Sequence, residues 1–203
     1  MNIIVKEKDD SISWEEVTEV LHSAHQSTKA QGMNFKAGKQ SAMETKKRVA
    51  DGKVIIALLE PEKKVVGTCA VTTYTECEKW YWKKAFVKFE MICVAEKYKG
   101  FGISKKILNE AERKAFCNFD LIELDTAENN RFAINMYKRR GFVLVDYVSW
   151  VGTNYYSVVM AKWKWGCPYS KIKCKLRFFY RKMRCKLLKD CYGRLRIKKF
   201  ING

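Results

Sequence analysis

Two glycines, in the segment Lys-Tyr-Lys-Gly-Phe-Gly-Ile-Ser at residues 97–104, have the spacing that most clearly suggests chemistry. An apolar run typical of a strand precedes this segment, and apolar positions at helical spacing follow it. A glycine-rich turn between a strand and a helix points several main-chain N–H groups, and the positive end of the helix dipole, at one spot. The segment therefore predicts an anion site made of main chain, to which Lys97 and Lys99 add charge.

Two other phosphate-binding motifs are excluded by inspection. The Rossmann pattern needs a third glycine at position 105, which is lysine. The Walker A pattern needs four residues between its glycines, and here only Phe101 separates Gly100 from Gly102. A plain strand-to-helix connection stays open as the alternative to a phosphate site.

A second stretch, at residues 129–142, reads Asn-Asn-Arg-Phe-Ala-Ile-Asn-Met-Tyr-Lys-Arg-Arg-Gly-Phe. Taken with the glycine loop, it resembles the GCN5-related N-acetyltransferases. Their coenzyme motif reads Arg/Gln-x-x-Gly-x-Gly/Ala and opens a long helix after a strand, and Lys97 departs from its first position. The departure is mild, because main-chain amides do most of the holding. The resemblance covers about residues 2–161 and implies acetyl-coenzyme A as co-substrate, with no metal.

The resemblance also implies which residues bind the coenzyme. In this family the strand before the loop splays from its neighbour, which leaves main-chain N–H groups for the pantetheine arm and the acetyl oxygen. The implied cofactor-binding residues are Ile92, Cys93, Val94, Lys97, Lys99, Gly100, Phe101, Gly102, Ile103, Ser104, Asn130 and Tyr137. Asn130 is also suited to cap the helix that follows it.

Tyr137 and Glu90 are the candidate catalytic residues. The family's equivalent tyrosine points its hydroxyl at the coenzyme sulfur, and a phenol with a pKa of about 10 can donate to a departing thiolate. Glu90 stands on the strand that leads into the loop, where some family members carry a carboxylate base. Each has a structural alternative: Tyr137 as a packing residue, and Glu90 as a surface glutamate paired with a lysine.

Other residues could line an acceptor groove. His22 and His25 share one face of the first predicted helix, although such histidines are more often solvated. Residues 80–82, Trp-Tyr-Trp, could form an acceptor wall suited to a sugar ring or a hydrophobic cover for the sheet.

The elements that must position these residues follow from periodicity and turn signals. The pattern predicts an α/β protein followed by a basic helical extension, and the resemblance implies the acetyltransferase fold, with a central mixed, mostly antiparallel sheet flanked by helices. The predicted strands cover residues 2–8, 54–59, 65–74, 86–94, 121–125, 142–149 and 155–161. The predicted helices cover residues 13–29, 42–50, 103–116 and 131–140, the first with a capping box formed by Ser13 and Glu16.

Composition narrows the class of protein. The 203 residues are 47% hydrophobic, which is a globular composition. We see no secretory signal and no apolar run long enough to span a membrane, so we expect a cytosolic protein whose eight cysteines are free thiols. No C-x-x-C pair is present, which disfavours a structural zinc site.

The net charge of +18 is unevenly distributed. Residues 162–203 hold fifteen Lys and Arg and one acid, or +14, which leaves +4 for residues 1–161. We therefore expect an acetyltransferase domain at residues 1–161 and a separate basic extension at residues 162–203.

The extension carries an apolar stripe at helical spacing, with Lys and Arg around the rest of the helix. The stripe consists of Ile172, Leu176, Phe179, Tyr180, Met183, Leu187 and Cys191. Three interpretations stay open. Residues 168–199 could lie on an anionic membrane surface, at the inner face; the stripe could dock on the acetyltransferase domain; or the charges could grip nucleic acid.

The sequence thus predicts an N-acetyltransferase that moves acetyl from acetyl-coenzyme A to a primary amine of a small molecule. An amino sugar in glycan biosynthesis is the preferred acceptor. The alternative is a non-catalytic acetyltransferase-like module whose basic tail binds nucleic acid or membrane.

Overall fold

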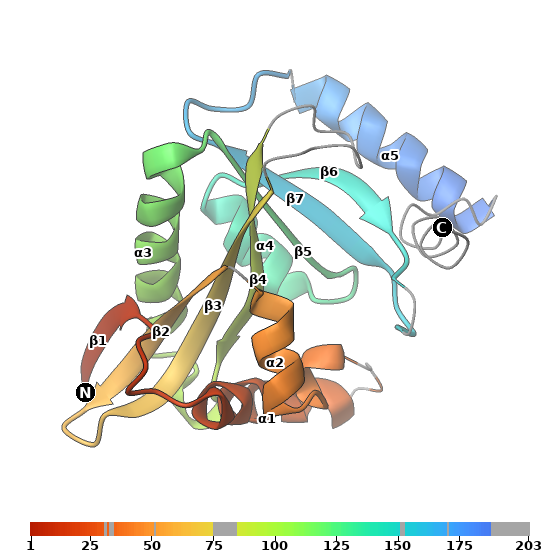
Figure 1. The fold of residues 1–203 in the computed structure, drawn as a ribbon. Coiled ribbons are helices and arrows are strands. Elements are labelled where there is room, and N and C mark those ends of the chain that lie inside the picture. The colour runs from red at the N-terminus through yellow and green to blue at the C-terminus, as the bar shows by residue number, and fades with distance from the viewer. Residues whose placement is uncertain are drawn as a thin grey trace. The chain divides into compact units, whose positions relative to one another are not determined.

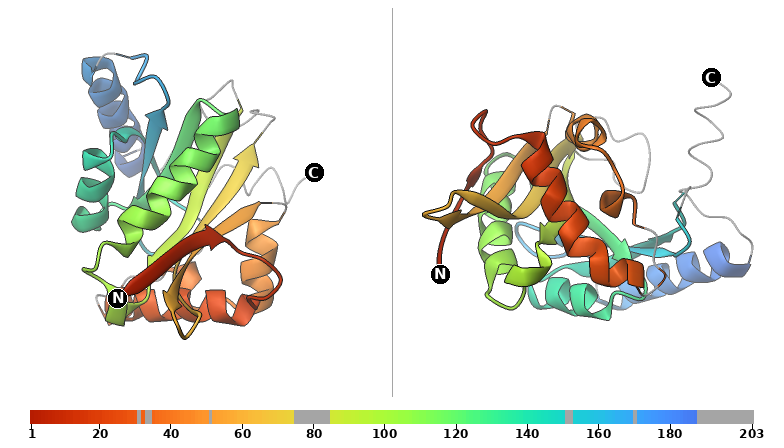
Figure 2. Two further views of the ribbon diagram at one scale, coloured as in Figure 1. Left: turned by 90° about the vertical axis from the view of Figure 1, so that its left-hand side faces the viewer. Right: turned by 90° about the horizontal axis from the view of Figure 1, so that it is seen from below.

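The computed structural model describes residues 1–30, 32, 35–50, 52–74, 85–150, 153–169 and 171–187. They fall into two compact units, Met1–Tyr74 with Val87–Phe119, and Thr75–Phe86 with Asp120–Gly203. Figures 1 and 2 show the elements of each unit. Seven strands carry helices packed on them, which confirms the predicted α/β fold class.

The first unit has the strand order β1-β2-β3-β4. β1 and β2 run antiparallel, from Asn2 opposite Glu60 to Glu7 opposite Ile55. The elements are β1 Asn2–Glu7, α1 Trp14–Ala30, η1 Lys36–Gly38, α2 Ala42–Val49, β2 Lys53–Glu60, β3 Lys64–Tyr74, β4 Phe86–Val94, η2 Glu96–Tyr98 and α3 Ile103–Asn118. The strands and α-helices agree with the predicted ranges to within one or two residues, and the two 3₁₀ turns, η1 and η2, were not predicted.

Helix α1 begins where the sequence predicts. The backbone N–H of Ser13 donates to Glu16 at 2.8 Å, and the N–H of Glu16 donates to the Ser13 hydroxyl at 3.1 Å, which completes the capping box. The apolar face of the helix, which includes Val17 and Leu21, is buried against β2, β3 and β4. This packing fixes the position of α1 beside β4, the strand that leads into the glycine loop.

Helix α3 packs on the other face of the same strands (Figure 2). Its inner positions Ile103, Ile107 and Leu108 are all buried. Close packing requires Gly67 on β3, because a Cβ there would lie 2.5 Å from Cδ1 of Ile107. The start of α3 is thereby held firmly against the sheet.

The second unit has the strand order β5-β7-β6. Its elements are β5 Leu121–Ala127, α4 Arg131–Arg139, β6 Val143–Val148, β7 Ser157–Trp163 and α5 Lys171–Leu187. β5 and β7 pair antiparallel from Leu121 opposite Trp163 to Ala127 opposite Ser157. α5 packs on β6 (Figure 1). Among the described residues, no helix is both long enough and apolar enough to cross a bilayer.

The cysteines differ in part from the sequence expectation. Those described as thiols are Cys69, Cys93, Cys117, Cys167 and Cys174. Cys185 is disulfide-bonded, so the expectation of eight free thiols is wrong at this position. A disulfide requires only that the fold bring two sulfur atoms together, and spacing along the chain does not reveal that.

Candidate functional site

The loop between β4 and α3 has the backbone that the sequence motif predicts. β4 ends at Val94, a single 3₁₀ turn follows, and α3 begins at Ile103. Gly100 and Gly102 have φ angles of 87° and 74°, in the left-handed region that glycine enters without steric penalty. The loop therefore depends on both glycines for its shape.

The start of α3 is open to a ligand. Gly102 occupies the N-cap position, and no side chain in the described structure caps the helix there. Within this first turn the N–H of Lys105 donates to the Gly102 carbonyl at 3.1 Å, and the start of a helix is in general a favourable place for an anion. A Cβ placed on Gly100 or on Gly102 would meet no protein atom within 4 Å, so main chain faces open space at both positions.

The loop side chains contribute less charge than the sequence suggests. The Lys99 ammonium donates to the carbonyl of Ala24 at 3.1 Å and forms an ion pair with Glu96. Lys97 is exposed, with its Nζ 5.9 Å from the centre of the Tyr98 ring. Phe101 is 64% exposed. The predicted anion site of this loop therefore depends mainly on main-chain amides and less on the two lysines.

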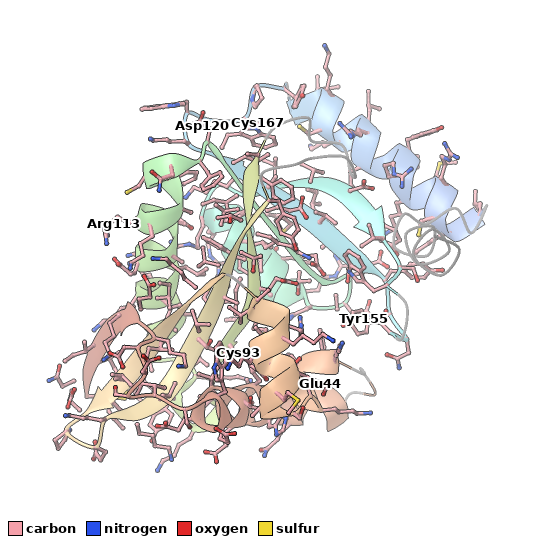
Figure 3. All side chains as sticks on the ribbon, viewed as in Figure 1. Glu44, Cys93, Arg113, Asp120, Tyr155 and Cys167 are labelled. Carbon is pink, nitrogen blue, oxygen red and sulfur yellow. The ribbon has the colours of Figure 1, made fainter. Side chains whose placement is uncertain are left out.

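The end of β4 has one irregular residue. Met91 has a φ of 49°, a left-handed conformation that costs a non-glycine residue about 1–2 kcal/mol. It interrupts the regular pleat between Glu90 and Ile92, and strain of this kind often accompanies functional sites. Cys93 is buried against α1, and burial raises the pKa of its thiol to about 12, so this residue stays a neutral core thiol (Figure 3).

Glu90 is partly buried between two cations. Its Oε1 lies 3.3 Å from the Lys88 Nζ and 3.8 Å from the Arg48 Nη2. The lysine partner agrees with the structural alternative, but the arginine comes from α2, 42 positions earlier in the chain. These two contacts hold the Glu90 carboxylate between residues of β4 and α2.

A polar network connects Glu90 to both helices on this face, and the sequence analysis missed it. Arg48 Nη1 donates to the Gln40 side-chain carbonyl at 2.6 Å. Gln40 is itself 2% exposed and donates to the Thr45 hydroxyl at 2.7 Å, and the Thr18 hydroxyl also donates to Thr45 at 2.7 Å. No pattern around Gln40 distinguishes it from a surface glutamine, so sequence alone gave no signal for this network.

The two histidines of α1 have different surroundings. His22 is exposed, and its Nε2 lies 2.9 Å from the carbonyl oxygen of Gln40. His25 stacks on Phe35 at 4.8 Å between ring centres and lies 3.6 Å from the Cys93 Sγ. Burial lowers the pKa of His25 to about 4, with the positive charges of Lys99 and Arg48 acting in the same direction. His25 is therefore neutral at neutral pH and is packed against Phe35 and Cys93.

The remaining motif residues lie in the second unit. Asn130 caps α4, where its Oδ1 accepts from the N–H of Ala133 at 3.2 Å, so the capping role is confirmed. Tyr137 is 5% exposed, on the buried side of α4, and packs edge-to-face on Phe142 at 5.9 Å between ring centres. Its predicted contact with the coenzyme sulfur stays a prediction.

Two further predictions have a more limited outcome. Residues 80–82, the aromatic run proposed for the acceptor, lie outside the described residues. Within the part of the chain that the structure describes, no group of three or more His, Cys, Asp or Glu side chains could hold a metal ion.

A strand, a left-handed glycine pair and a helix start without a side-chain cap form a backbone arrangement typical of main-chain anion sites. The acetyltransferase (GNAT) family profile matches residues 14–142. The chain belongs to this family, and the resemblance found in its two motifs is confirmed.

Solved structures share the fold at low sequence identity. An Arabidopsis thaliana NAA60 structure in complex with acetyl-CoA has a TM-score of 0.61 and 16% identity, and the match covers 81% of this chain and 100% of that one. The Escherichia coli ribosomal-protein-S18-alanine N-acetyltransferase has a TM-score of 0.63 and 11% identity, with coverage of 84% and 98%. An Elizabethkingia anophelis GNAT acetyltransferase with acetyl-CoA bound has a TM-score of 0.58 and 14% identity, with coverage of 80% and 98%. No curated protein matches the sequence significantly.

Proposed function

We propose that this chain transfers the acetyl group of acetyl-CoA to a primary amine of a small molecule. The observation that carries the proposal is the backbone at Gly100 and Gly102, which presents open main chain at the start of α3. Pyrophosphate is an anion that such a helix start binds well. Acetyl-CoA supplies the thioester, and relatives with this fold have been solved with it bound.

In the proposed reaction the amine nitrogen attacks the thioester carbonyl, a C–N bond forms and the C–S bond breaks. Main-chain N–H groups at residues 92–94 would hydrogen-bond the developing oxyanion, and one preorganised donor of this kind contributes about 3 kcal/mol. Tyr137 would donate its phenolic proton to the departing thiolate, and the second proton that the nitrogen loses as the amide forms would restore the phenol, directly or through water. The buried phenol suits this step because bulk water does not compete there.

Glu90 is the proposed base. Before attack, the ammonium form of the acceptor must lose a proton, and the Glu90 carboxylate would accept it directly or through water. Lys88 and Arg48 support this role by position, because their side chains lie 3.3 Å and 3.8 Å from the Glu90 Oε1 and hold the carboxylate in place. Arg48 is a positioning residue here, since it also hydrogen-bonds Gln40.

An amino sugar is the acceptor we favour, for use in glycan biosynthesis. Support comes from two polar side chains on the helices of the first unit, Arg48 of α2 and His22 of α1, since hydrogen-bonding groups suit an acceptor rich in hydroxyls. We place the reaction in the cytosol, which agrees with the five described thiols, whereas the disulfide at Cys185 does not support it.

Release of coenzyme A in the presence of a panel of amines tests the proposal. The panel should hold amino sugars, aliphatic amines and a peptide with a free α-amine, with hydrolysis in the absence of amine as the background. We expect release above background with at least one amino sugar. Release with the peptide alone would exclude the small-molecule acceptor. Tight acetyl-CoA binding without release for any amine would favour the alternative, a non-catalytic module with a basic tail.

A further inference from the structure

Helix α5 is docked on its own unit by a face that the sequence did not single out. Arg181 Nε donates to the Asp146 Oδ1 on β6 at 2.9 Å, and both side chains are almost fully buried. One turn further along, Cys185 is fully buried. One turn earlier, the Phe178 ring meets Tyr147 edge-on at 6.1 Å between ring centres. These positions recur every three or four residues and form one continuous docked face.

A second ionic contact fixes the rotation of the helix. Glu128 receives ion pairs from Lys182 and from Lys186, the latter at 3.3 Å, and it also accepts from the Tyr147 hydroxyl. Burial acts to raise the pKa of Glu128, but hydrogen bonds from Lys182 and Tyr147 outweigh it and lower the pKa. With Glu128 and Asp146 both engaged, α5 has little freedom to roll on β6.

The apolar stripe is consequently held on the opposite side of the helix, in solvent. Its members advance by three or four residues and lie about half a turn from the docked face. They are between 44% and 71% exposed: Ile172, Leu176, Phe179, Tyr180, Met183 and Leu187. The chain just before the helix adds two more exposed aromatic residues, Trp165 at 83% and Tyr169 at 49%. Figure 3 shows side chains projecting from α5 on the side away from β6.

Positive side chains border the stripe on both sides. At 100° per residue, Lys173, Arg177 and Arg184 fall on one border and Lys175 falls on the other, where Lys186 is already paired with Glu128. Residues 171–187 contain no Asp or Glu. The outer surface of α5 is therefore an apolar strip with aromatic members and with cations on both borders.

We propose that this outer face of α5 binds an anionic membrane surface, with the helix lying in the plane of the interface. The hypothesis that the stripe docks on the protein is wrong, because a different face docks and leaves the stripe exposed. Nucleic acid would bind the cations through its phosphates but would make no use of the six exposed apolar side chains. A bilayer with anionic headgroups rewards both, and aromatic residues such as Trp165 and Tyr169 favour its interface. This surface is independent of the acetyl transfer proposed above.

Co-sedimentation of the full chain with phosphatidylcholine vesicles, with and without phosphatidylserine, tests the proposal. We expect binding that requires phosphatidylserine. The double variant Leu176→Gln/Phe179→Gln, which keeps every charge, should lower the partition coefficient at least about tenfold. Lys173→Glu/Lys175→Glu should lower it by a similar factor.

Matched controls come from α2 of the first unit. Met43 is 81% exposed, and Met43→Gln repeats the apolar-to-polar change away from α5. Lys47 is also exposed, and Lys47→Glu repeats the charge reversal. Both controls should bind vesicles within about twofold of the unaltered chain. All the substitutions are at exposed positions, so circular dichroism should show the fold intact.

Three results would overturn the proposal. One is absence of binding to the phosphatidylserine vesicles. Another is unchanged binding by Leu176→Gln/Phe179→Gln, which would leave a purely ionic attraction. The third is tight, strongly salt-dependent binding of duplex DNA without vesicle binding. Turnover of a soluble amine should be measured with the same preparations, because normal turnover without vesicle binding would contradict only the membrane proposal and not the proposed reaction.

Discussion

The glycine loop at residues 97–104 and helix α5 are both basic in sequence, but the proposed binding role of each depends on different atoms. In the loop Lys99 is already paired with Glu96, and the proposed binding groups are those of the main chain at Gly100 and Gly102. In α5 the backbone is a regular helix, and its side chains make both the docked face and the proposed membrane-binding face. A local motif can specify a backbone shape, whereas the use of a helix face depends on what the rest of the fold places beside it.

The largest effect is expected at the buried Arg181–Asp146 pair, which docks α5 on β6. Asp146→Ala would leave the Arg181 guanidinium facing a buried site without its carboxylate partner, and should lower the free energy of unfolding by about 3 kcal/mol. Urea denaturation of the two single alanine variants and the double variant gives the coupling energy. Additive effects would show that the pair does not hold α5. The surface pair Glu110–Arg113 is the control, and Glu110→Ala should change stability little.

The next largest effect is expected on turnover, at Tyr137, the proposed acid. Tyr137→Phe keeps the ring that packs on Phe142 and removes only the hydroxyl, so kcat should fall by about 10² while acetyl-CoA affinity stays nearly unchanged. Steady-state kinetics together with calorimetry would show this split. A turnover close to that of the unaltered chain would leave Tyr137 with its packing role alone.

The free energy of unfolding should depend on pH through His25. The pKa of His25 is about 4 in the folded chain against 6.5 in its ordinary state, so between these values the unfolded chain binds more protons. The contribution of neutral His25 is complete above pH 6.5 and is lost as pH falls toward 4. It is on the order of 2 kcal/mol, allowing for partial exposure of the ring. His25→Gln should flatten the unfolding free energy in this window, and an unchanged slope would contradict the assignment.

Local rules account for most of what the sequence predicts correctly. The capping box at Ser13 and Glu16, the apolar spacing of α3 and the two positive-φ glycines each depend on residues close together in the chain. The apolar stripe of α5 also follows from local spacing, and its members lie on one side of the helix as expected.

What the sequence could not predict depends on distant contacts. The docked face of α5 is set by Asp146, 35 positions before Arg181. The Arg48–Glu90 contact joins α2 to β4, and the left-handed Met91 has no sequence signature, because methionine rarely adopts that conformation. Each needs the three-dimensional neighbours before it can be recognised.

Calorimetric titration of acetyl-CoA into the unaltered chain and into Gly102→Val tests the central claim most directly. A valine at this φ of 74° would strain the loop, and its side chain would occupy the space where the pyrophosphate must approach. Gly166→Val is the matched control, since Gly166 also has a positive φ, of 90°, with no atom within 4 Å of an added Cβ, and lies outside the loop. We predict affinity weakened tenfold or more for Gly102→Val and unchanged for Gly166→Val. Equal affinity of folded Gly102→Val and the unaltered chain would contradict the assignment of residues 97–104 as the coenzyme site.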